Sequence, residues 1–517
     1  MKAIDRKTII FVAAVTALRM VITSRLGLHP DEAYYWLWSG YPDFGYYDHP
    51  PMFAYFIRVA TLLLGDSLFA VRLPALLSGI VISFSVYNIA RILFPEDKKI
   101  PFWSVVLLNV MPLTASGILI TPDVPSLLFW SLSMWLFATM VDLSLPTDDS
   151  GLSSSSNRSY PSWLLLGILS GLGLLSKYTS VLFPVCAAFY LVISVSADDR
   201  RILLTPQPYL ALVTAILIFS PVIFWNAAHN WISFAFQLRH GAGPAGGAPV
   251  NLANFFNFIG AQVASGGIFP TVIGISGGAV FLFLKNNPRR FLSAMTLPVF
   301  VLFGFAALKS PGEANWTAPA YIGVSIIVSS VVFRQGNKNL WSKIISTLTI
   351  ALPAILTLTL YLQAAYRIIH FEDINPAWLL MEPTNRFYGW REFTDYMLKI
   401  SDGKPIIAPD HQSAALLLYY AGQSKKNSAS PDTHQTFHHL EIRAGTNNFI
   451  FYEKFTAPVD GKCFTFDYTT DVNTGPVDFS KFSDVKEAGV FESERDGVVI
   501  RRYRIYECRN FSGFARN

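Results

Sequence analysis

Long apolar segments fill the first 362 residues, and they constrain the fold of this 517-residue chain more than any other feature. A helix that crosses a bilayer needs about 20 mostly apolar residues. Segments of that kind lie at 8–25, 68–94, 101–121, 124–142, 161–176, 178–196, 207–226, 257–284, 291–308, 316–333 and 340–362. The chain is therefore predicted to be mainly α, with a polytopic α-helical membrane domain of about eleven spans. The shorter apolar stretch 52–64 is predicted to be an interfacial or re-entrant helix.

The charged residues divide the chain into two parts. Of the 75 charged residues (40 basic plus 35 acidic), 37 lie in 1–362 and 38 in the remaining 155 positions. The second part has short strand-like stretches at 404–408, 448–452, 498–500 and 503–506, and a helix-like stretch at 413–420. We expect a membrane domain over 1–362 and a soluble α/β domain over 363–517.

Basic residues in the short loops predict the orientation, because cytoplasmic loops carry an excess of Lys and Arg. Lys2, Arg6 and Lys7 precede the first apolar segment, and no small-x-small cleavage site follows it. This segment is therefore predicted to be a retained first span, with the N-terminus on the cytoplasmic side. The loops at 95–99, 144–160, 198–201, 285–290 and 334–343 then face the cytoplasm. With an odd number of spans, the C-terminal domain faces the outer side.

Acidic residues stand at the outer ends of the apolar segments. Asp31 and Glu32 follow His29-Pro30, and Asp123 lies in Ile120-Thr121-Pro122-Asp123. Carboxylates near hydrocarbon are costly and tend to be functional. Two interpretations stay open at each place: a catalytic or electrostatic role, or capping of the helix that follows.

The same outer loop continues to Tyr46-Tyr47-Asp48-His49-Pro50-Pro51. A rigid turn with a solvated Asp48 and His49 explains this motif as well as a substrate site does. A divalent metal also stays open, because such a site needs several converging His or carboxylate ligands. The candidate ligands are His29, Asp31, Glu32, Asp48, His49 and His240, without a tight ligand spacing.

Cations on the predicted outer side could hold a phosphate, which needs fixed positive charge. Lys177 and Lys309 each end an apolar segment, where snorkelling to the headgroups is the alternative role. Arg72 lies near a helix start, where the dipole disfavours a cation, so we expect it to have an anionic partner. The other candidates are Arg239 and His240.

Aromatic and polar residues accompany these charges. Tyr34, Tyr35 and Tyr47 suit an interfacial belt or the stacking of sugar rings. Glu313, Asn315 and Trp316 belong to a dense polar cluster that leads straight into an apolar segment. The chain has no Walker loop, dinucleotide fingerprint or catalytic-serine elbow, which argues against soluble nucleotide chemistry. The net charge of +5 is small and spread over short loops, so it does not indicate nucleic-acid binding. Cys463 and Cys508 form a disulfide if their domain faces an oxidising compartment, and are otherwise free thiols.

Taken in order, these motifs resemble those of polytopic glycosyltransferases with the GT-C fold. The chain is similar to the bacterial branch grouped with protein O-mannosyltransferases and with the aminoarabinose transferases that modify lipid A. The resemblance rests on Asp31–Tyr35, Tyr47–Pro51, Arg72–Pro74, Thr121–Asp123, Leu175–Tyr178, His229–His240, Lys309–Trp316 and Arg386–Trp390.

The resemblance implies transfer of a sugar from a polyprenyl-phosphate donor to a lipid A, lipopolysaccharide, other glycan or protein acceptor. It places the chain in the bacterial inner membrane with its C-terminal domain in the periplasm. It also implies that Asp31 is the leading catalytic carboxylate, assisted by Glu32 and Asp123. The donor phosphate is then held by Lys177, Arg239, His240, Lys309 and Arg72. The substrate-binding residues are Tyr34, Tyr35, Tyr47, Asp48, His49, Glu313, Asn315 and Trp316.

Two other functions remain as alternatives. A transporter or flippase of polyprenyl-linked sugars predicts charges deep within spans and inverted repeats, whereas the charges here cluster at segment ends. A scaffolding membrane protein leaves the acids at the segment ends unexplained. No cofactor is certain; the metal stays open.

Overall fold

The computed structural model describes residues 4–143, 159–242, 249–334, 339–426, 442–443, 458–468 and 477–513. The predicted strand at 448–452 and most of the predicted loop at 144–160 lie outside these residues. Contacts divide the chain into two compact units. The first comprises Met1–Val21, Asp43–Phe53 and Arg72–Thr359, and the second Ile22–Pro42, Ala54–Val71 and Leu360–Asn517. The last segment of the second unit begins at Leu360, and this unit also takes in two N-terminal segments that lie within the predicted membrane domain 1–362.

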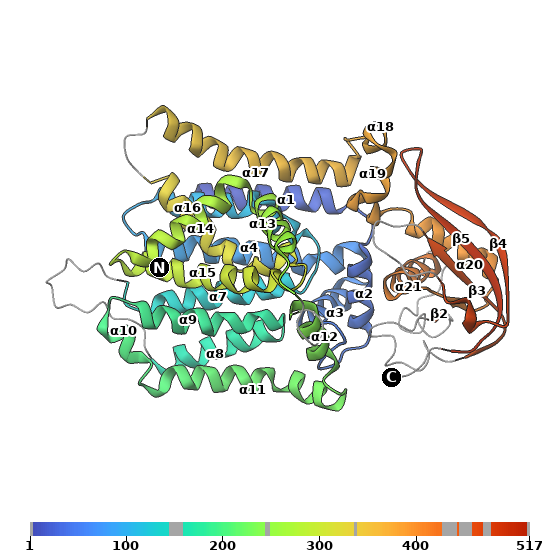
Figure 1. Ribbon diagram of the computed structural model, residues 1–517, viewed down its shortest axis with the longest axis horizontal. Coiled ribbons are helices and arrows are strands. Elements are labelled where there is room, and N and C mark those ends of the chain that lie inside the picture. The colour runs from blue at the N-terminus through green and yellow to red at the C-terminus, as the bar shows by residue number, and fades with distance from the viewer. Residues whose placement is uncertain are drawn as a thin grey trace. The chain divides into compact units, whose positions relative to one another are not determined.

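In the described part of the first unit, all regular structure is helical (Figure 1). Its longer helices are α1 (Arg6–Thr23), α4 (Leu68–Leu93), α5 (Lys99–Val110), α7 (Asp123–Met140), α8 (Tyr160–Leu174), α9 (Leu182–Ile193), α11 (Pro206–Ala228), α13 (Leu252–Gly266), α14 (Ile268–Phe283), α15 (Asn287–Ala307), α16 (Ala320–Val332) and α17 (Leu340–Tyr366). Its shorter ones are α6 (Pro112–Ala115), α10 (Ala197–Ile202) and α12 (Ile232–Ala242). Each predicted apolar segment coincides with one or two of these helices.

Two segments that the sequence presents as single spans are broken helices. The segment 101–121 bends by 72° between α5 and α6, directly before Pro112, which cannot donate a backbone hydrogen bond to α5. The segment 257–284 bends by 110° at Gly267, whose φ of 84° is left-handed. A Cβ at Gly267 would lie 2.6 Å from the Pro353 Cγ atom, so only glycine fits this corner.

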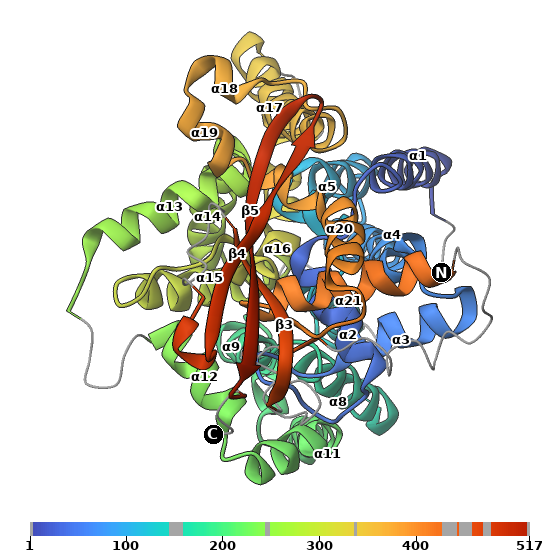
Figure 2. The same cartoon turned by 90° about the vertical axis from the view of Figure 1, so that its right-hand side faces the viewer.

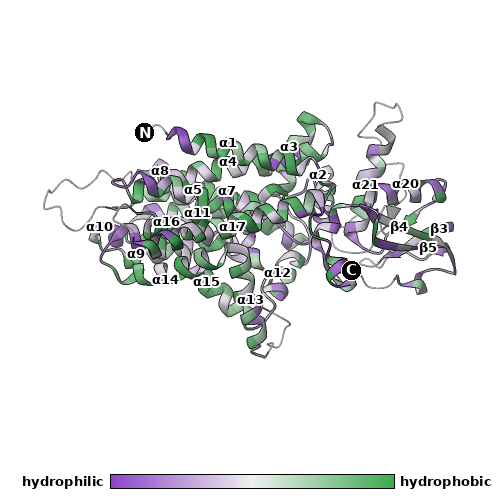
Figure 3. Cartoon of the chain, turned by 90° about the horizontal axis from the view of Figure 1, so that it is seen from above, coloured by the Kyte–Doolittle hydropathy of each residue, from purple (hydrophilic) through white to green (hydrophobic). Residues whose placement is uncertain are grey.

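The apolar surface of the first unit fits a membrane environment. Among the residues that the structure describes, four helices are long and apolar enough to cross a bilayer (α4, α11, α15 and α17), or up to six if each bent pair counts as one span. Four further apolar helices of the described chain have 10–17 residues, among them α3 (Met52–Leu64), where a short helix was predicted. In α17 only 22% of the most apolar stretch is buried inside the protein. Figure 3 shows the same predominance of hydrophobic residues along the long helices.

The second unit combines helices with one small sheet. Its helices are α2 (Pro30–Gly40), most of α3, α18 (Phe371–Ile374), α19 (Pro376–Met381), α20 (Trp390–Ser401) and α21 (His411–Lys426). The strands are β1 (Ile406–Ile407), β2 (Ile442–Arg443), β3 (Val459–Tyr468), β4 (Asp484–Arg495) and β5 (Val498–Phe511), in the order β2-β1-β3-β5-β4. Strand β1 pairs parallel to both neighbours, whereas β3–β5 and β5–β4 are antiparallel.

Local sequence explains the long hairpin of β4 and β5 and the helix beside it (Figure 2). Asp496 and Gly497 both have positive φ, as a two-residue turn between twisted strands requires. In α20 the buried Trp390, Phe393 and Met397 recur at helical spacing. The Phe393 ring stacks on Tyr503 of β5 with ring centroids 3.7 Å apart, which fixes the helix against the sheet.

Cys463 and Cys508 occupy directly facing positions of β3 and β5. Both thiols are buried and are not joined by a disulfide. Facing residues of antiparallel strands bring their Cβ atoms to roughly 5 Å. The fold therefore places the two sulfurs in register, and a bridge between them stays a prediction.

Candidate active site

Five separate segments of the first unit bring most of the predicted site residues together. They are the loop that contains Asp48 and His49, the first turn of α7, the segment that follows α8, helix α12, and the segment between α15 and α16. The sequence placed all five on one predicted side of the membrane. Their mutual contacts, described next, bear out that these segments meet.

Lys177 and Asp123 form an ion pair at the centre of this cluster. The Lys177 Nζ atom lies 2.7 Å from the Asp123 Oδ1 atom, and their side chains are 11% and 17% exposed. The second Asp123 oxygen accepts a hydrogen bond of 2.8 Å from the Asn315 Nδ2 atom. Asp123 is the first residue of α7 and makes no side-chain cap, so the capping alternative is wrong there. The buried ion pair likewise excludes simple snorkelling for Lys177.

Asn315 also offers an acceptor to a ligand. Its amide nitrogen must face the Asp123 carboxylate, because only that atom can donate. The Oδ1 atom is consequently turned away from Asp123. It is buried and accepts no hydrogen bond from any described residue. A buried acceptor of this kind is costly unless a donor, such as a substrate hydroxyl, meets it.

The loop before α3 is fixed by α12. The Gln237 Nε2 atom donates to the Asp48 carbonyl oxygen at 2.6 Å and lies 3.4 Å from the His49 Nδ1 atom. Burial, together with the nearby Lys177 ammonium, lowers the pKa of His49 to about 3. His49 is therefore neutral near pH 7 and can accept or donate one hydrogen bond there.

His240 and Glu313 form a second, more exposed pair. The His240 Nε2 atom lies 3.0 Å from the Glu313 Oε1 atom. The hydrogen bond with Glu313 raises the pKa of His240 above its usual value, and the same bond lowers the pKa of Glu313. Ser310 donates to the His240 carbonyl oxygen at 2.9 Å and so fixes the end of α12.

The remaining predicted residues of the first unit have varied environments. Arg239 and Lys309 are exposed, whereas Arg72 is only 1% exposed. Tyr47 packs on Phe236, and burial followed by the nearby Asp48 charge raises its pKa. Trp316 is 7% exposed, so its ring stabilises the packing of this region.

In the second unit, Glu32 belongs to a capping box at the start of α2. The His29 Nδ1 atom accepts a hydrogen bond from the Asp31 backbone, and the Glu32 carboxylate accepts one from the His29 backbone at 3.1 Å. Histidine thus replaces the usual Ser or Thr, which hides the motif in the sequence. Glu32 is fully buried, whereas the Asp31 side chain is 41% exposed. The cap is therefore provided by His29 and Glu32, and the Asp31 carboxylate is not the cap.

Helix α21 approaches the Asp31 carboxylate. The Gln412 Nε2 atom donates to the Asp31 Oδ1 atom at 2.6 Å. The neighbouring His411 ring contacts the Tyr34 ring, with centroids 4.5 Å apart. Tyr34 and Tyr35 are buried, which shows that both rings pack within the protein, and sugar contact by them stays a prediction.

Sequence reasoning missed Gln237, Gln412 and Arg19. The two glutamines carry no motif, because their importance depends on which loop they reach. Arg19, in contrast, interrupts an apolar segment, which is a signal for function or a buried partner. The expectation that charges avoid the interior of spans is wrong at this position.

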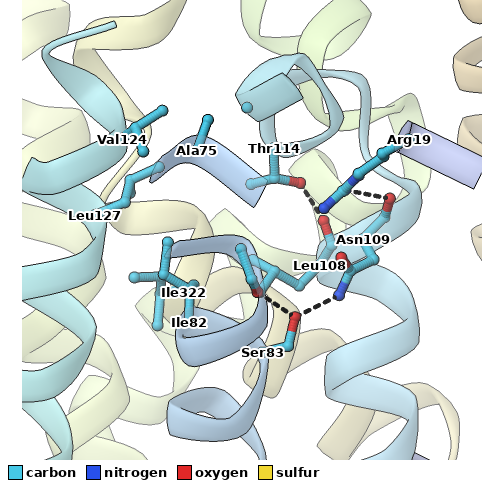
Figure 4. A pocket seen from close by; sticks show the side chains of 12 residues that line it. Arg19, Ala75, Ile82, Ser83, Leu108, Asn109, Thr114, Val124, Leu127 and Ile322 are labelled. Carbon is cyan, nitrogen blue, oxygen red and sulfur yellow. Dashed lines mark hydrogen bonds between the residues drawn. The ribbon is translucent and has the colours of Figure 1, made fainter. Parts of the chain in front are cut away.

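Figure 4 shows the surroundings of Arg19. Its guanidinium reaches the Asn109 carbonyl oxygen at 3.4 Å, and the Asn109 side chain donates to the Ser83 Oγ atom at 3.0 Å. These groups line a cavity of about 40 Å³ that also touches Val124, the neighbour of Asp123. The cavity has room for about one water molecule and is too small for a sugar.

In the part of the chain that the structure describes, no three His, Cys, Asp or Glu side chains converge as metal ligands would. The predicted metal ligands belong to different units: Asp48, His49 and His240 to the first, and His29, Asp31 and Glu32 to the second. The His49 ring lies beside the Gln237 side chain. Metal dependence stays open.

Comparison with known proteins supports the same reading of the fold. The family model described as dolichyl-phosphate-mannose-protein mannosyltransferase matches residues 48–225. The structure of ArnT from Cupriavidus metallidurans bound to undecaprenyl phosphate superposes with a TM-score of 0.60 over 96% of this chain and 97% of ArnT, at 13% identity. The chain has the GT-C fold. The predicted GT-C fold is thereby confirmed.

Two curated relatives are also similar to this GT-C chain. The lipid A galacturonosyltransferase RgtD of Rhizobium johnstonii is 26% identical over 318 residues, which are 60% of this chain and 62% of RgtD. The undecaprenyl phosphate-alpha-4-amino-4-deoxy-L-arabinose arabinosyl transferase of Yersinia pestis is 24% identical over 213 residues, 39% of this chain and 36% of that protein. The chain thus spans less than two thirds of either relative.

Proposed function

We propose that this protein is a membrane glycosyltransferase that moves a sugar from a polyprenyl-phosphate donor to a lipid A, lipopolysaccharide, other glycan or protein acceptor. The GT-C fold and the activities named for the two relatives support this assignment. The observation that carries it is the nearly buried Lys177 ammonium, which lies 2.7 Å from the Asp123 carboxylate. It stands where the five segments of the first unit described above meet. A fixed cation at such a place suits a phosphate that arrives on a lipid.

We assign donor binding to this cluster in the first unit. Lys177 holds the phosphate, with His240, Arg239, Lys309 and Arg72 as the further cationic groups. Asp123 keeps the Lys177 ammonium in place until the donor arrives. The Asn315 Oδ1 atom and the neutral His49 ring, near Asp48, Tyr47, Glu313 and Trp316, offer hydrogen bonds to sugar hydroxyls. Fixed charges of this kind stabilise the negative charge that develops on a leaving phosphate.

We assign proton transfer to Asp31 in the second unit. The acceptor hydroxyl or amine attacks the anomeric carbon and gives its proton to the Asp31 carboxylate. The bond from that carbon to the phosphate oxygen breaks at the same time, and polyprenyl phosphate leaves. Glu32 assists by holding the first turn of α2, which places Asp31 at the helix start.

We also propose the finer topology that the sequence indicates. The chain crosses the bacterial inner membrane about eleven times, with a cytoplasmic N-terminus. Residues 363–517 then form a periplasmic α/β domain. Cysteine accessibility labelling of single positions in the turn 95–99 and in strand β4 at 485–489 tests this arrangement, because the two segments are expected to react from opposite sides.

Mass spectrometry of envelope lipids and glycans tests the activity. Cells with the gene should contain a product heavier by one sugar, which cells without the gene and cells with Asp31→Asn lack. Asp198→Asn is the matched control, because Asp198 is an exposed acid in α10, away from both clusters. An Asp31→Asn protein that still forms the product at the normal level would contradict the role of Asp31 as the base.

Transport of polyprenyl-linked sugars is the second candidate, and the buried Arg19 in α1 is the observation that favours it. Transport predicts no new glycan product. It predicts instead that deletion changes the distribution of polyprenyl-phosphate sugars between the two leaflets. The same extracts, analysed after leaflet-selective labelling, distinguish these outcomes.

A further inference from the structure

A large cavity lies in the first unit, away from the candidate active site. It has a volume of about 500 Å³ and is bounded by the end of α4, the turn that leads to α5, the start of α15 and the residues after α16. That volume is within the usual range of ligand pockets. None of the residues assigned above to catalysis or donor binding lines it.

Two arginines line this cavity without a carboxylate partner among the described residues. Arg289 and Arg334 form no ion pair with any residue that the structure describes. Arg289 stands in the first turn of α15, where the helix dipole disfavours a cation, and its guanidinium lies 5.4 Å from the centre of the Phe281 ring. Its neighbour Arg290 differs, because it donates to the carbonyl oxygens of Leu284 and Ile193. Arg290 therefore holds the local structure, whereas Arg289 is available to an anion.

Acidic groups line the same cavity. Glu96 and Asp97 come from the turn between α4 and α5. Glu96 is exposed and makes no ion pair with either arginine, although all of these side chains border one space. Charges of opposite sign that served only the fold would be expected to pair directly. Their separation across a cavity suits a ligand that carries both signs of charge.

The remaining wall is apolar. Phe94 and Ile100 belong to it, together with the other aliphatic residues at the end of α4. A small soluble zwitterion has no apolar part to place there. A lipid does, because its glycerol backbone and first methylene groups follow directly after the headgroup. Basic pockets between membrane helices are known sites for lipid headgroups.

We propose that this cavity binds a phospholipid whose headgroup carries a primary ammonium. The Arg289 and Arg334 guanidiniums hold the phosphate, and Glu96 holds the ammonium, while the lipid tails leave along the apolar wall. Guanidinium and phosphate groups form strong, bidentate hydrogen bonds. The site is independent of the proposed transferase activity, since it shares no residue with it.

Native mass spectrometry of the full-length protein in detergent tests this inference. The protein is titrated with phosphatidylethanolamine or with phosphatidylglycerol, which lacks the ammonium. We expect the amine lipid to bind about tenfold more tightly to the wild type, which corresponds to about 1.4 kcal/mol. Arg289→Gln/Arg334→Gln should lose most of this binding. Lys285→Gln is the matched control, because Lys285 is an exposed cation just before α15 that does not line the cavity.

Glu96→Gln provides a second measurement at an exposed position that the fold tolerates. It should remove the preference for the amine lipid while phosphatidylglycerol binding is kept. Equal binding of both lipids to the wild type, or an unchanged preference in Glu96→Gln, would overturn the proposal. Displacement of the lipid by an equal concentration of soluble phosphoethanolamine would also overturn the proposal. It would show that the cavity binds the headgroup alone and gains nothing from the lipid tails.

Discussion

The Lys177–Asp123 ion pair permits a test that separates its structural role from its proposed role in donor binding. At 2.7 Å and an effective dielectric constant of 20, the attraction between two unit charges is about 6 kcal/mol, from 332/(20 × 2.7). Desolvation offsets much of this value. Removing one partner of a buried pair costs about 3–5 kcal/mol, because the other charge is left uncompensated.

Asp123→Ala should therefore lower the free energy of unfolding by about 3 kcal/mol. Lys177→Met should cost less, since the uncharged chain of methionine fits the apolar part of the site. The double variant should regain much of the stability, which gives a coupling energy of about 2 kcal/mol or more in the double-mutant cycle. Unfolding by SDS titration in detergent measures each stability.

Donor binding should behave differently in the same four proteins. Lys177→Met and the double variant should both fail to bind a polyprenyl-phosphate sugar, although the double variant is stable. Asp123→Asn keeps an acceptor for Asn315 and separates that hydrogen bond from the charge. If the double variant recovers donor binding together with its stability, Lys177 does not hold the phosphate and the assignment is refuted.

Two further predictions concern the surrounding residues. Gln412→Ala removes the 2.6 Å hydrogen bond to Asp31 and should lower the rate of transfer about tenfold without changing donor affinity. Gln423→Ala is the control, because it removes a hydrogen bond of equal length to the Asp66 carbonyl oxygen. Equal losses of rate in both variants would contradict a role of Gln412 through Asp31. Glu313 is already ionised above its ordinary pKa of 4.5, and the pKa of His240 is raised above 6.5. Their pair is therefore formed between pH 4.5 and pH 6.5 and is lost as the pH rises through the raised value of His240. Donor affinity should fall as the pH rises through the raised pKa of His240, and Glu313→Gln should move that fall to lower pH. If the pH profile of donor affinity is the same in Glu313→Gln, His240 does not bind the donor.

The sequence predicts the helices of the first unit well, because the length of an apolar segment alone identifies an apolar helix. It fails at Gly267, where the apolar pattern continues through a 110° bend. That bend depends on backbone conformation, which hydropathy does not record. The positions of Asp123 and Lys177 at segment ends on one predicted side indicate that they could meet, but the pairing itself depends on how α7 and α8 pack.

The acids of the first loop show a different limit. Asp31 and Glu32 are adjacent carboxylates, and their residue types alone do not show which one stays accessible. One helical residue corresponds to a rotation of about 100°. Glu32 therefore turns into the protein and joins the capping box with His29, while Asp31 reaches Gln412. A histidine at the N-cap was the signal available for this difference.

The hydrogen bond between Gln412 and Asp31 joins residues that are 381 positions apart in the sequence. A ribosome that adds 5–20 residues each second needs roughly 20 to 80 s to make the chain between them. Helix α2 is therefore synthesised long before helix α21, on which it packs, and its buried aromatic face has to be shielded for that time by lipid or by a chaperone. A chain that stops before α21 would carry all of the apolar helices described here and still lack α21 and strands β2–β5 of the second unit. Premature termination should thus produce a membrane-inserted protein in which α2 has lost its packing partner, and quality control would have to recognise that helix.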